Sequence, residues 1–419
     1  MVGLPTILQY SRGGRSEIDF EKRVECPICM GDFKDCKLER CPYLRDVRDL
    51  LLKVSKMKVV YGSSPPSILV GSWGYPKVNL GPLLPPVIED TSLMEKHELW
   101  LDIPLEKILS MRLSLVYGRR PVKVYDARNP DKLLQAIQEI ALSQQPVSIE
   151  MFLEKEPRIN LSFSIRTSPT GPAAPLEKIQ LTENPKTLNV VEKIVSDVDL
   201  RAGEAIVTLY LNGVPEYGIT RLLSSGMIGT KHRRKIVPTE WSITAVDDVL
   251  GRRFRRYVKT YDWIIEYYLY CFEAHYNRVA ILMMPGPWSF EVIEIWRRLS
   301  SYRIYVDSEL PGEADKYPEN VGGAYHALRL PILEKLYREK RQASILVIAE
   351  VGEEWIPLGV WRFREICRRA LQRPPKKFNT LKEALDEIKK TTLTDSKYWR
   401  QLSRVLEFHK FQESITEFM

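Results

Sequence analysis

The chain has 419 residues, a length at which about two to three domains are expected. Its composition, 44% hydrophobic and 28% charged, excludes a disordered, collagen-like or disulfide-stapled chain. The 62 Lys and Arg against 54 Asp and Glu give a formal net charge of +8, which permits an acidic partner such as nucleic acid without requiring one. Apolar runs fall short of the ~18 residues of a membrane span and the start lacks the pattern of a secretory signal, so the sequence predicts a cytoplasmic protein without membrane contact.

The first feature along the chain is a cluster of four cysteines, Cys26, Cys29, Cys36 and Cys41. The Cys-x2-Cys pair places two thiolates on one tight turn, which suits adjacent corners of a tetrahedral zinc site. An iron–sulfur cluster is the alternative, because Cys41 is followed by proline as in ferredoxins. Four protein ligands leave zinc no open coordination position, so this site is expected to be structural and to organise the N-terminus.

Between this cluster and residue 275 the patterns change several times. Residues 43–52 predict an amphipathic helix. Residues 62–86 are so rich in Gly, Pro and Ser that neither helix nor central strand is expected, and we favour a rigid structural loop. Phosphate binding by its backbone amides is a second hypothesis. Further along we expect a turn-rich region with arginines at 118–121 and 126–130, a helix at 131–143, strands at 147–153, 158–165 and 205–211, and a loop at 167–175.

The last third of the sequence alternates between strand and helix patterns. Strands are expected at 279–284, 302–306 and 345–348, and helices at 290–299, 324–338, 380–390 and 396–410. Thr380 and Glu383 match a capping box. The alternation predicts βαβ units with a parallel component, and a mixed α/β (α+β) fold. The expected regions are a four-cysteine metal module at 1–58, a central region with Gly/Pro-rich loops and basic segments at 59–275, a C-terminal α/β region at 276–411, and a tail at 412–419.

A basic segment in the middle of the chain is a candidate nucleic-acid contact. From Lys231 to Lys259 there are nine Lys or Arg and three acidic residues. Basic side chains neutralise phosphates, and Trp241, Phe254 and Tyr257 are available for stacking on bases. The alternative is an ordinary solvated surface. The candidate DNA-binding residues are Lys231, Arg233, Arg234, Lys235, Arg252, Arg253, Arg255 and Arg256.

Catalytic patterns are weak in this sequence. It has neither His-Glu-x-x-His nor Gly-x-Ser-x-Gly. Asp247 and Asp248 are candidate ligands of a catalytic metal, although helix capping explains them equally well. Cys271 and His275 are expected to pack in the core on a Tyr-rich helix. Three further acids in expected loops are weak candidates, and no catalytic residue is assigned: Asp197, Asp199 and Glu216.

The last eight residues match the pattern of peptides that bind sliding clamps. Gln412 is followed by the aliphatic Ile415 and then by Phe418, while Met419 stands where the pattern has a second aromatic residue. A short 3₁₀ turn would place Ile415 and Phe418 on one face, and methionine fills apolar pockets adaptably. An ordinary frayed amphipathic tail is the alternative.

Several blocks of the sequence together resemble the archaeal Nre proteins. They are Cys26-Pro-Ile-Cys29 with Cys36 and Cys41-Pro-Tyr-Leu44, Gly62-Ser-Ser-Pro-Pro-Ser67, Gly118-Arg-Arg-Pro-Val-Lys123, Gly226-Met-Ile-Gly-Thr-Lys-His-Arg-Arg-Lys235, and the tail. The resemblance covers nearly the whole chain. It implies a two-region protein with a four-cysteine metal site that works in DNA damage repair with the sliding clamp PCNA.

Two mechanisms follow from these expectations. In the first, a non-catalytic adaptor holds DNA by its basic segments and the clamp by its tail. In the second, a metal-dependent nuclease or another enzyme processes damaged or branched DNA, which requires several carboxylates to converge beside the basic residues. RNA processing is a third and weaker alternative, because attraction to phosphate does not distinguish the sugars.

Overall fold

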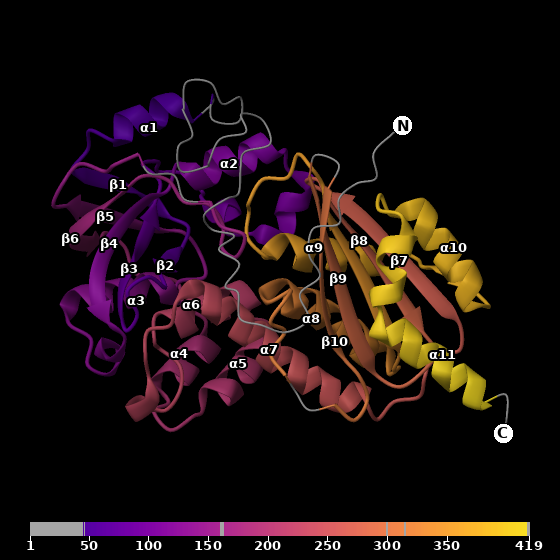
Figure 1. Ribbon diagram of the computed structural model, residues 1–419. Coiled ribbons are helices and arrows are strands. Elements are labelled where there is room, and N and C mark those ends of the chain that lie inside the picture. Colours follow the sequence, from indigo (N-terminus) through magenta and orange to yellow (C-terminus); the bar gives the residue numbers. More distant parts are fainter. Residues whose placement is uncertain (1–44, 46, 160–162, 299–300, 314–315, 417–419) are drawn as a thin grey trace. The chain divides into compact units, whose positions relative to one another are not determined.

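The computed structural model describes residues 45, 47–159, 163–298, 301–313 and 316–416 (Figure 1). These residues form two compact units. The N-terminal unit comprises the described residues up to Leu250 together with Pro357–Gly359, and the C-terminal unit comprises Gly251–Ile356 and the described residues from Val360. The division between Leu250 and Gly251 falls inside the helix at Thr239–Val258, whereas the sequence predicts a boundary between residues 275 and 276. The predicted domain boundaries stay predictions. No helix within the described ranges is long and apolar enough to cross a membrane.

The N-terminal unit is built on a six-stranded sheet with the order β1-β5-β6-β4-β3-β2. Neighbouring strands are antiparallel except β4 and β6, which are parallel. The strands are β1 (Val59–Ser64), β2 (Ile68–Val70), β3 (Lys77–Leu84), β4 (Val116–Lys123), β5 (Val147–Leu153) and β6 (Ala173–Leu181). The α-helices are α1 (Arg48–Val54), α2 (Leu105–Leu113), α3 (Lys132–Leu142), α4 (Asn189–Ser196), α5 (Ala202–Leu211), α6 (Glu216–Ser224) and α7 (Thr239–Val258). The 3₁₀ helices are η4 (Ser92–Met94), η5 (His97–Asp102), η6 (Val124–Arg128) and η7 (Lys231–Arg233).

The segment rich in Gly, Pro and Ser forms strands, so the expectation of loops at 62–86 is wrong. The end of β1 and all of β2 and β3 lie within it, and the turn-rich region expected at 118–121 is part of β4. Close strand packing explains the composition. A Cβ atom on residue 81 would lie 1.6 Å from the carbonyl oxygen of Gly118. Only glycine at position 81 therefore allows this close approach of β3 to β4.

Two further expectations for this unit are wrong. Residues 205–211 belong to α5, in which Ala205, Ile206 and Leu209 bury one helical face; β-branched residues do not prevent a helix that tertiary packing stabilises. The strand expected at 158–165 is also missing from the described part of that range, where Arg158 makes only an isolated bridge to Ala173. The predicted helix at 131–143 and strand at 147–153 are confirmed as α3 and β5.

The C-terminal unit is built on a second six-stranded sheet, with the order β10-β9-β11-β8-β7-β12. Its strands are β7 (Tyr267–Ala274), β8 (Asn277–Met284), β9 (Ser289–Arg298), β10 (Ser301–Glu309), β11 (Ser344–Val351) and β12 (Lys376–Phe378). Its helices are α8 (Gly323–Glu339), α9 (Trp361–Gln372), α10 (Leu381–Thr391), η8 (Ser396–Tyr398), η9 (Arg400–Leu402) and α11 (Arg404–Thr416). β9 and β11 are parallel and the other pairs are antiparallel, so the predicted parallel component is confined to one pair.

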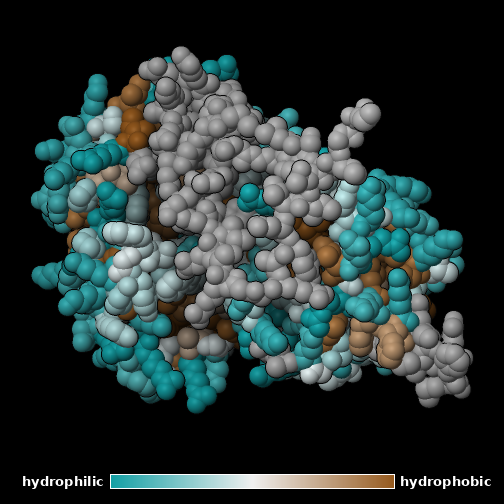
Figure 2. Space-filling model, in the orientation of Figure 1, coloured by the Kyte–Doolittle hydropathy of each residue, from teal (hydrophilic) through white to brown (hydrophobic). Residues whose placement is uncertain are grey.

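Helices cover both faces of this second sheet (Figure 1). On one face Leu282, Ile293 and Leu346 pack against α10 and α11. The continuous apolar run of β8 follows from this arrangement, because a strand covered on both faces has no solvent side. The outward surface of α10 is hydrophilic, as expected for a helix whose Leu385 and Ile388 face the sheet (Figure 2).

Buried charged residues give one strand of this sheet a sequence pattern that is typical of a helix. The helix expected at 290–299 is strand β9, because Glu291 and Glu294 produce a three-residue polar spacing although both are buried. The backbone amide of Arg404 donates to Glu291 at 2.9 Å, and Ser403 also donates to that carboxylate. Residues 271 and 275 lie on β7 and in the turn after it, so the expected Tyr-rich helix is wrong.

Most of the remaining expectations for this unit are confirmed, and one is only partly right. The strands at 279–284, 302–306 and 345–348 and the helices at 324–338 and 380–390 are confirmed. Thr380 and Glu383 form the predicted capping box. The helix expected at 396–410 is two short 3₁₀ helices followed by α11. A mixed α/β fold is therefore confirmed for the described residues.

Candidate nucleic-acid interface

The first basic segment lies in a loop between α6 and α7, which we call the η7 loop (residues 225–238). Gly226 has a φ of 71°, and a side chain there would meet Cβ of Ala127 at 2.5 Å, so the turn after α6 requires glycine. At the other end, the amide of Ile236 donates to the carbonyl oxygen of Val124 at 2.8 Å. These contacts fix both ends of the η7 loop against η6.

Arg234 holds the η7 loop from inside. Its Nε donates to the carbonyl oxygen of Gly229 at 2.9 Å, and its Nη2 donates to those of Val195 at 2.8 Å and Asp197 at 2.9 Å. Burial lowers the pKa of this guanidinium, and the nearby Asp197 carboxylate opposes that shift. The side chain of Arg234 therefore attaches the η7 loop to the C-terminal end of α4 (Asn189–Ser196).

The neighbours of Arg234 face solvent. Lys231, Arg233 and Lys235 are all exposed. The carboxylate of Asp197 accepts hydrogen bonds from the backbone amides of Asp199 and Leu200 at 2.9 and 3.0 Å. The η7 loop therefore presents three cationic side chains on a backbone whose shape is fixed by other residues.

The second basic segment lies at the C-terminal end of α7 and belongs to the C-terminal unit. Arg255 forms an ion pair with Glu309 at 2.7 Å. Arg253 stacks its guanidinium over Tyr257, with Cζ 4.7 Å from the ring centroid. Arg252 and Arg256 are exposed. The eight predicted DNA contacts thus fall into two groups on different units. Arg234 of the first group and Arg253 and Arg255 of the second make contacts within their own unit.

The predicted catalytic acids are distributed over several elements. Asp247 is buried and Asp248 half-buried in the interior of α7, so the expectation that either caps a helix is wrong. Glu216 is buried in the first turn of α6 instead of lying in a loop. Within the described ranges, no group of three or more His, Cys, Asp or Glu side chains is placed to hold a metal ion.

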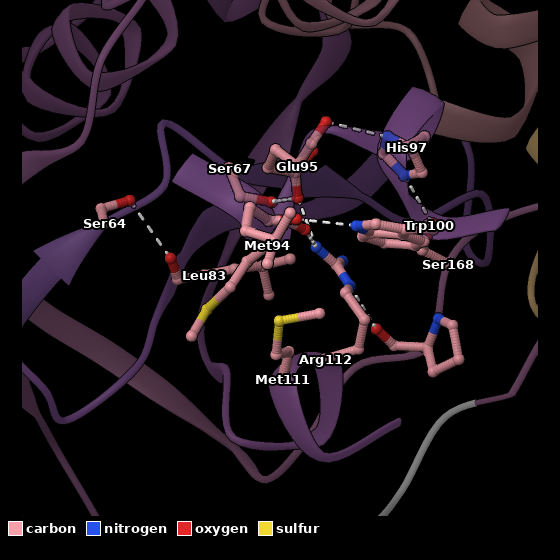
Figure 3. A network of polar contacts seen from close by, with 12 residues as sticks. Ser64, Ser67, Leu83, Met94, Glu95, His97, Trp100, Met111, Arg112 and Ser168 are labelled. Atoms are coloured by element: carbon pink, nitrogen blue, oxygen red, sulfur yellow. Dashed lines mark hydrogen bonds and ion pairs between the residues drawn. The ribbon is translucent and has the colours of Figure 1, made fainter. Parts of the chain in front are cut away.

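A buried polar network lies beneath the Gly-Ser-Ser-Pro-Pro-Ser segment (Figure 3). Ser67 donates to Oε1 of Glu95 at 2.6 Å, and Arg112 forms an ion pair with the same carboxylate. Arg112 also donates to the carbonyl oxygens of Met94 at 3.0 Å and Pro169 at 3.1 Å. Burial raises the pKa of Glu95 and the Arg112 guanidinium lowers it, and the net direction is downward, so this buried pair stays charged.

His97 extends this network to α6. Its Nδ1 lies 3.0 Å from the carbonyl oxygen of Glu95, and its Nε2 lies 3.0 Å from Oγ of Ser168 (Figure 3). A ring nitrogen that faces a carbonyl oxygen carries the proton, so in a neutral ring Nε2 accepts from the serine hydroxyl. The ring also stacks on Tyr217, with centroids 4.2 Å apart. These internal contacts agree with a rigid structural role for the segment around Ser67.

Two predicted sites lie wholly or partly outside the described residues. Cys26, Cys29, Cys36 and Cys41 are outside them. In the tail, the backbone from Gln412 to Thr416 continues α11, where the sequence predicts a 3₁₀ turn, and Phe418 and Met419 are outside the described residues. The metal site and the clamp-binding tail stay predictions.

The fold and the exposed cations define a two-unit mixed α/β protein with basic surfaces. Its sequence matches the archaeal Nre family over almost its whole length: residues 36–303 match "Archaeal Nre, N-terminal" and residues 309–418 match "Archaeal Nre, C-terminal". The chain belongs to the archaeal Nre family, as the resemblance indicates.

Curated relatives agree with this assignment. The chain is 33% identical to DNA repair protein NreB of Archaeoglobus fulgidus, over 94% of this chain and 100% of the relative. It is 35% identical to DNA repair protein NreA of the same organism, over 90% of this chain and 96% of the relative. It is 34% identical to DNA repair protein NreA of Haloferax volcanii, over 78% of this chain and 82% of the relative. No solved structure matches the fold.

Proposed function

We propose that this protein acts in DNA repair as an adaptor that binds DNA through its exposed basic residues and the sliding clamp through its tail. The names of its relatives support the role in repair. The observation that carries the proposal is the η7 loop, where Lys231, Arg233 and Lys235 are exposed while Arg234 fixes the backbone. Arg252 and Arg256 of α7 add cations on the C-terminal unit.

Binding by these residues is electrostatic. Each phosphate that a Lys or Arg neutralises releases condensed counterions, which favours binding most at low salt. A fixed loop lowers the entropic cost of placing its charges on the backbone of the DNA. Phosphate contacts alone do not read base sequence, so binding with little sequence preference is expected.

Charge reversal tests the proposal. The double variant Arg233→Glu/Lys235→Glu should lose DNA affinity by at least tenfold at 50–100 mM salt, since it removes two phosphate contacts and adds repulsion (about 1.4 kcal/mol per tenfold). Fluorescence anisotropy with labelled DNA measures the effect. The control is Lys382→Glu/Lys389→Glu on α10, which makes the same charge change on exposed lysines. Equal losses in the two variants would contradict a role for the η7 loop.

The tail is proposed to bind PCNA through Gln412, Ile415, Phe418 and Met419. A peptide of this size gains its affinity from a few buried anchors, and a micromolar dissociation constant, about −8 kcal/mol, is expected. Calorimetry with the purified clamp should show binding by the intact chain and none by Phe418→Ala. Glu417→Ala, inside the tail but outside the anchor set, is the control and should bind normally.

The four cysteines are proposed to hold a structural zinc ion. Four thiolates form a closed tetrahedral donor set, and zinc binding contributes roughly 10–16 kcal/mol in small modules. Elemental analysis should give one zinc per chain, and Cys26→Ser should release it. A brown protein with iron and labile sulfide would instead establish the iron–sulfur alternative.

The nuclease alternative has a direct assay. Purified protein is incubated with labelled duplex, branched and damaged DNA in the presence of Mg²⁺ or Mn²⁺. An adaptor leaves every substrate intact. Metal-dependent cleavage that Asp247→Asn or Asp248→Asn abolishes would establish the enzyme instead.

A further inference from the structure

The β2–β3 hairpin of the N-terminal unit carries aromatic side chains that the fold does not bury. Trp73 is 89% exposed and Tyr75 is 41% exposed. Trp241, which is 44% exposed at the start of α7, lies with its ring centroid 5.1 Å from that of Tyr75. Exposed aromatic clusters of this kind mark binding surfaces, because leaving such area in water gains nothing for stability.

The hairpin is held in place by backbone hydrogen bonds. The amide of Tyr75 donates to Ser72 at 3.3 Å, and the amide of Lys77 donates to Gly74 at 3.0 Å, which closes the turn that carries Trp73. The amide of Val70 donates to Oγ1 of Thr239 at 2.9 Å and so attaches the hairpin to the first residue of α7. These hydrogen bonds therefore hold the turn that carries Trp73 and the first turn of α7, which carries Trp241, in fixed positions next to each other.

This aromatic cluster is continuous with the η7 loop. The amide of Val124 donates to the carbonyl oxygen of Pro76 at 3.0 Å, and the carbonyl oxygen of Val124 accepts from Ile236 at 2.8 Å. The first residue of η6 therefore contacts both the hairpin and the η7 loop. This helix adds Tyr125, which is 55% exposed, with Cζ of Arg128 4.5 Å from the ring centroid.

Basic side chains accompany these rings. Lys77 and Lys123 are exposed and face each other across the β3–β4 pair, and Arg128 is exposed on η6. The neighbouring acids are engaged. Asp126 accepts from the backbone amide of Lys123 at 2.8 Å, and Glu240 forms an ion pair with Arg166 at 3.2 Å. Aromatic faces and cations therefore follow each other from the hairpin to the η7 loop.

We infer that this aromatic–basic surface (Trp73, Tyr75, Tyr125 and Trp241 with Lys77, Lys123, Arg128 and the η7 loop) binds single-stranded DNA. Bases in a duplex are stacked on each other and offer no free face to a protein ring, whereas a single strand exposes the face of each base. Rings spaced between cations suit a strand whose bases stack on the protein while its phosphates contact Lys and Arg. The inference rests on the proposed DNA-binding function and specifies the form of DNA bound.

The experiment compares three labelled probes with full-length protein: a thymidine oligonucleotide, a blunt duplex and the matching uridine oligonucleotide. Trp73→Ala should weaken binding of the thymidine oligonucleotide roughly 5- to 100-fold, the range expected for one lost stacked base, and leave duplex affinity within about twofold. Trp263→Ala, which removes a tryptophan that is 51% exposed on the C-terminal unit, is the control and should change neither affinity. Binding of the oligonucleotide should also quench tryptophan fluorescence less in Trp73→Ala.

The outcomes separate this inference from the proposed function. Equal loss of both DNA probes in Trp73→Ala, or no loss, would overturn the stacking surface. If Arg233→Glu/Lys235→Glu still abolished duplex binding, the proposed function would survive that result. Tighter binding of the uridine oligonucleotide than of the thymidine oligonucleotide would overturn the assignment to DNA. No binding of any probe by the wild-type protein would overturn both proposals.

Discussion

The η7 loop and the C-terminal end of α7 each carry four basic residues, yet the structure uses them differently. In the η7 loop, Arg234 donates only to backbone carbonyl oxygens, which do not cancel its neighbours' charge. At the end of α7, Arg255 is paired with the carboxylate of Glu309, which also accepts from Arg329 at 3.1 Å and from Trp288 at 2.7 Å.

A count of charged residues in the sequence does not show whether a carboxylate elsewhere in the fold pairs with them. Both groups look alike in sequence, but a carboxylate from a distant strand neutralises part of the second group. Nε of Arg128 also donates to the carbonyl oxygen of Arg234 at 3.4 Å, so the field of the η7 loop adds to that of a neighbouring cation. The first group is therefore the stronger site for phosphate, and the comparison can be tested residue by residue.

The largest expected effect comes from removing the carboxylate that pairs with the second group. Glu309→Ala removes a carboxylate that forms ion pairs with the largely buried Arg255 and Arg329, and should destabilise the C-terminal unit by about 3–5 kcal/mol. Denaturant unfolding measures the change. Glu313→Ala breaks a more exposed pair with Arg404 and should cost about 1 kcal/mol or less. Similar losses of stability in both variants would show that the ion pairs of Glu309 contribute no more than a more exposed ion pair does.

Glu291 is a buried carboxylate without a close guanidinium partner. Its negative charge should lower the stability of the folded chain, whereas the charge of Glu309 raises it. Burial is the main cause that raises the pKa of Glu291 to about 7, against hydrogen bonds from Ser403 and Arg404 that lower it. The folded chain therefore keeps this proton to a higher pH than the unfolded chain does, and stability is lost as pH rises from about 4.5 to about 7. Glu291→Gln should reduce that loss by about 2–3 kcal/mol, as unfolding at pH 5 and pH 8 would measure. An unchanged pH dependence would contradict the assignment.

Arg234 should matter for stability, whereas its neighbour should not. Arg234→Ala removes the donor to three carbonyl oxygens and should cost about 1–2 kcal/mol. Arg233→Ala changes an exposed side chain and should alter stability by no more than about 0.5 kcal/mol. Thermal unfolding distinguishes the two. Equal stabilities would mean that Arg234 does not hold the η7 loop.

Periodicity predicts elements well where burial follows the ordinary pattern. The alternation of β5, the apolar run of β8 and the capping box of α10 are local signals, and each is confirmed. The pattern fails where a distant contact decides. Glu291 and Glu294 imitate a helical spacing on β9 because their partners come from other elements, and Gly81 lies in a strand because β4 approaches it.

The candidate site shows the same limit. The sequence identifies Lys231, Arg233 and Lys235 as cations, but cannot distinguish them from the inward-pointing Arg234. It gives no sign that Tyr125 and Arg128 adjoin the η7 loop, since that depends on hydrogen bonds between segments about a hundred residues apart. Of the exposed rings of this surface, the basic segment of the sequence points to Trp241, whereas Trp73 in its Gly/Pro-rich turn is found only from its exposure in the structure.

The salt dependence of DNA binding tests the central claim most directly. The affinity of labelled DNA is measured between 50 and 300 mM salt for the wild type, for Arg233→Ala/Lys235→Ala and for Arg252→Ala/Arg256→Ala. If the η7 loop contacts phosphates, the first double variant should lower the slope of log affinity against log salt by roughly 0.7–0.9 per lost contact, and the α7 variant should lower it less. A slope that stays at the wild-type value in Arg233→Ala/Lys235→Ala would contradict the account.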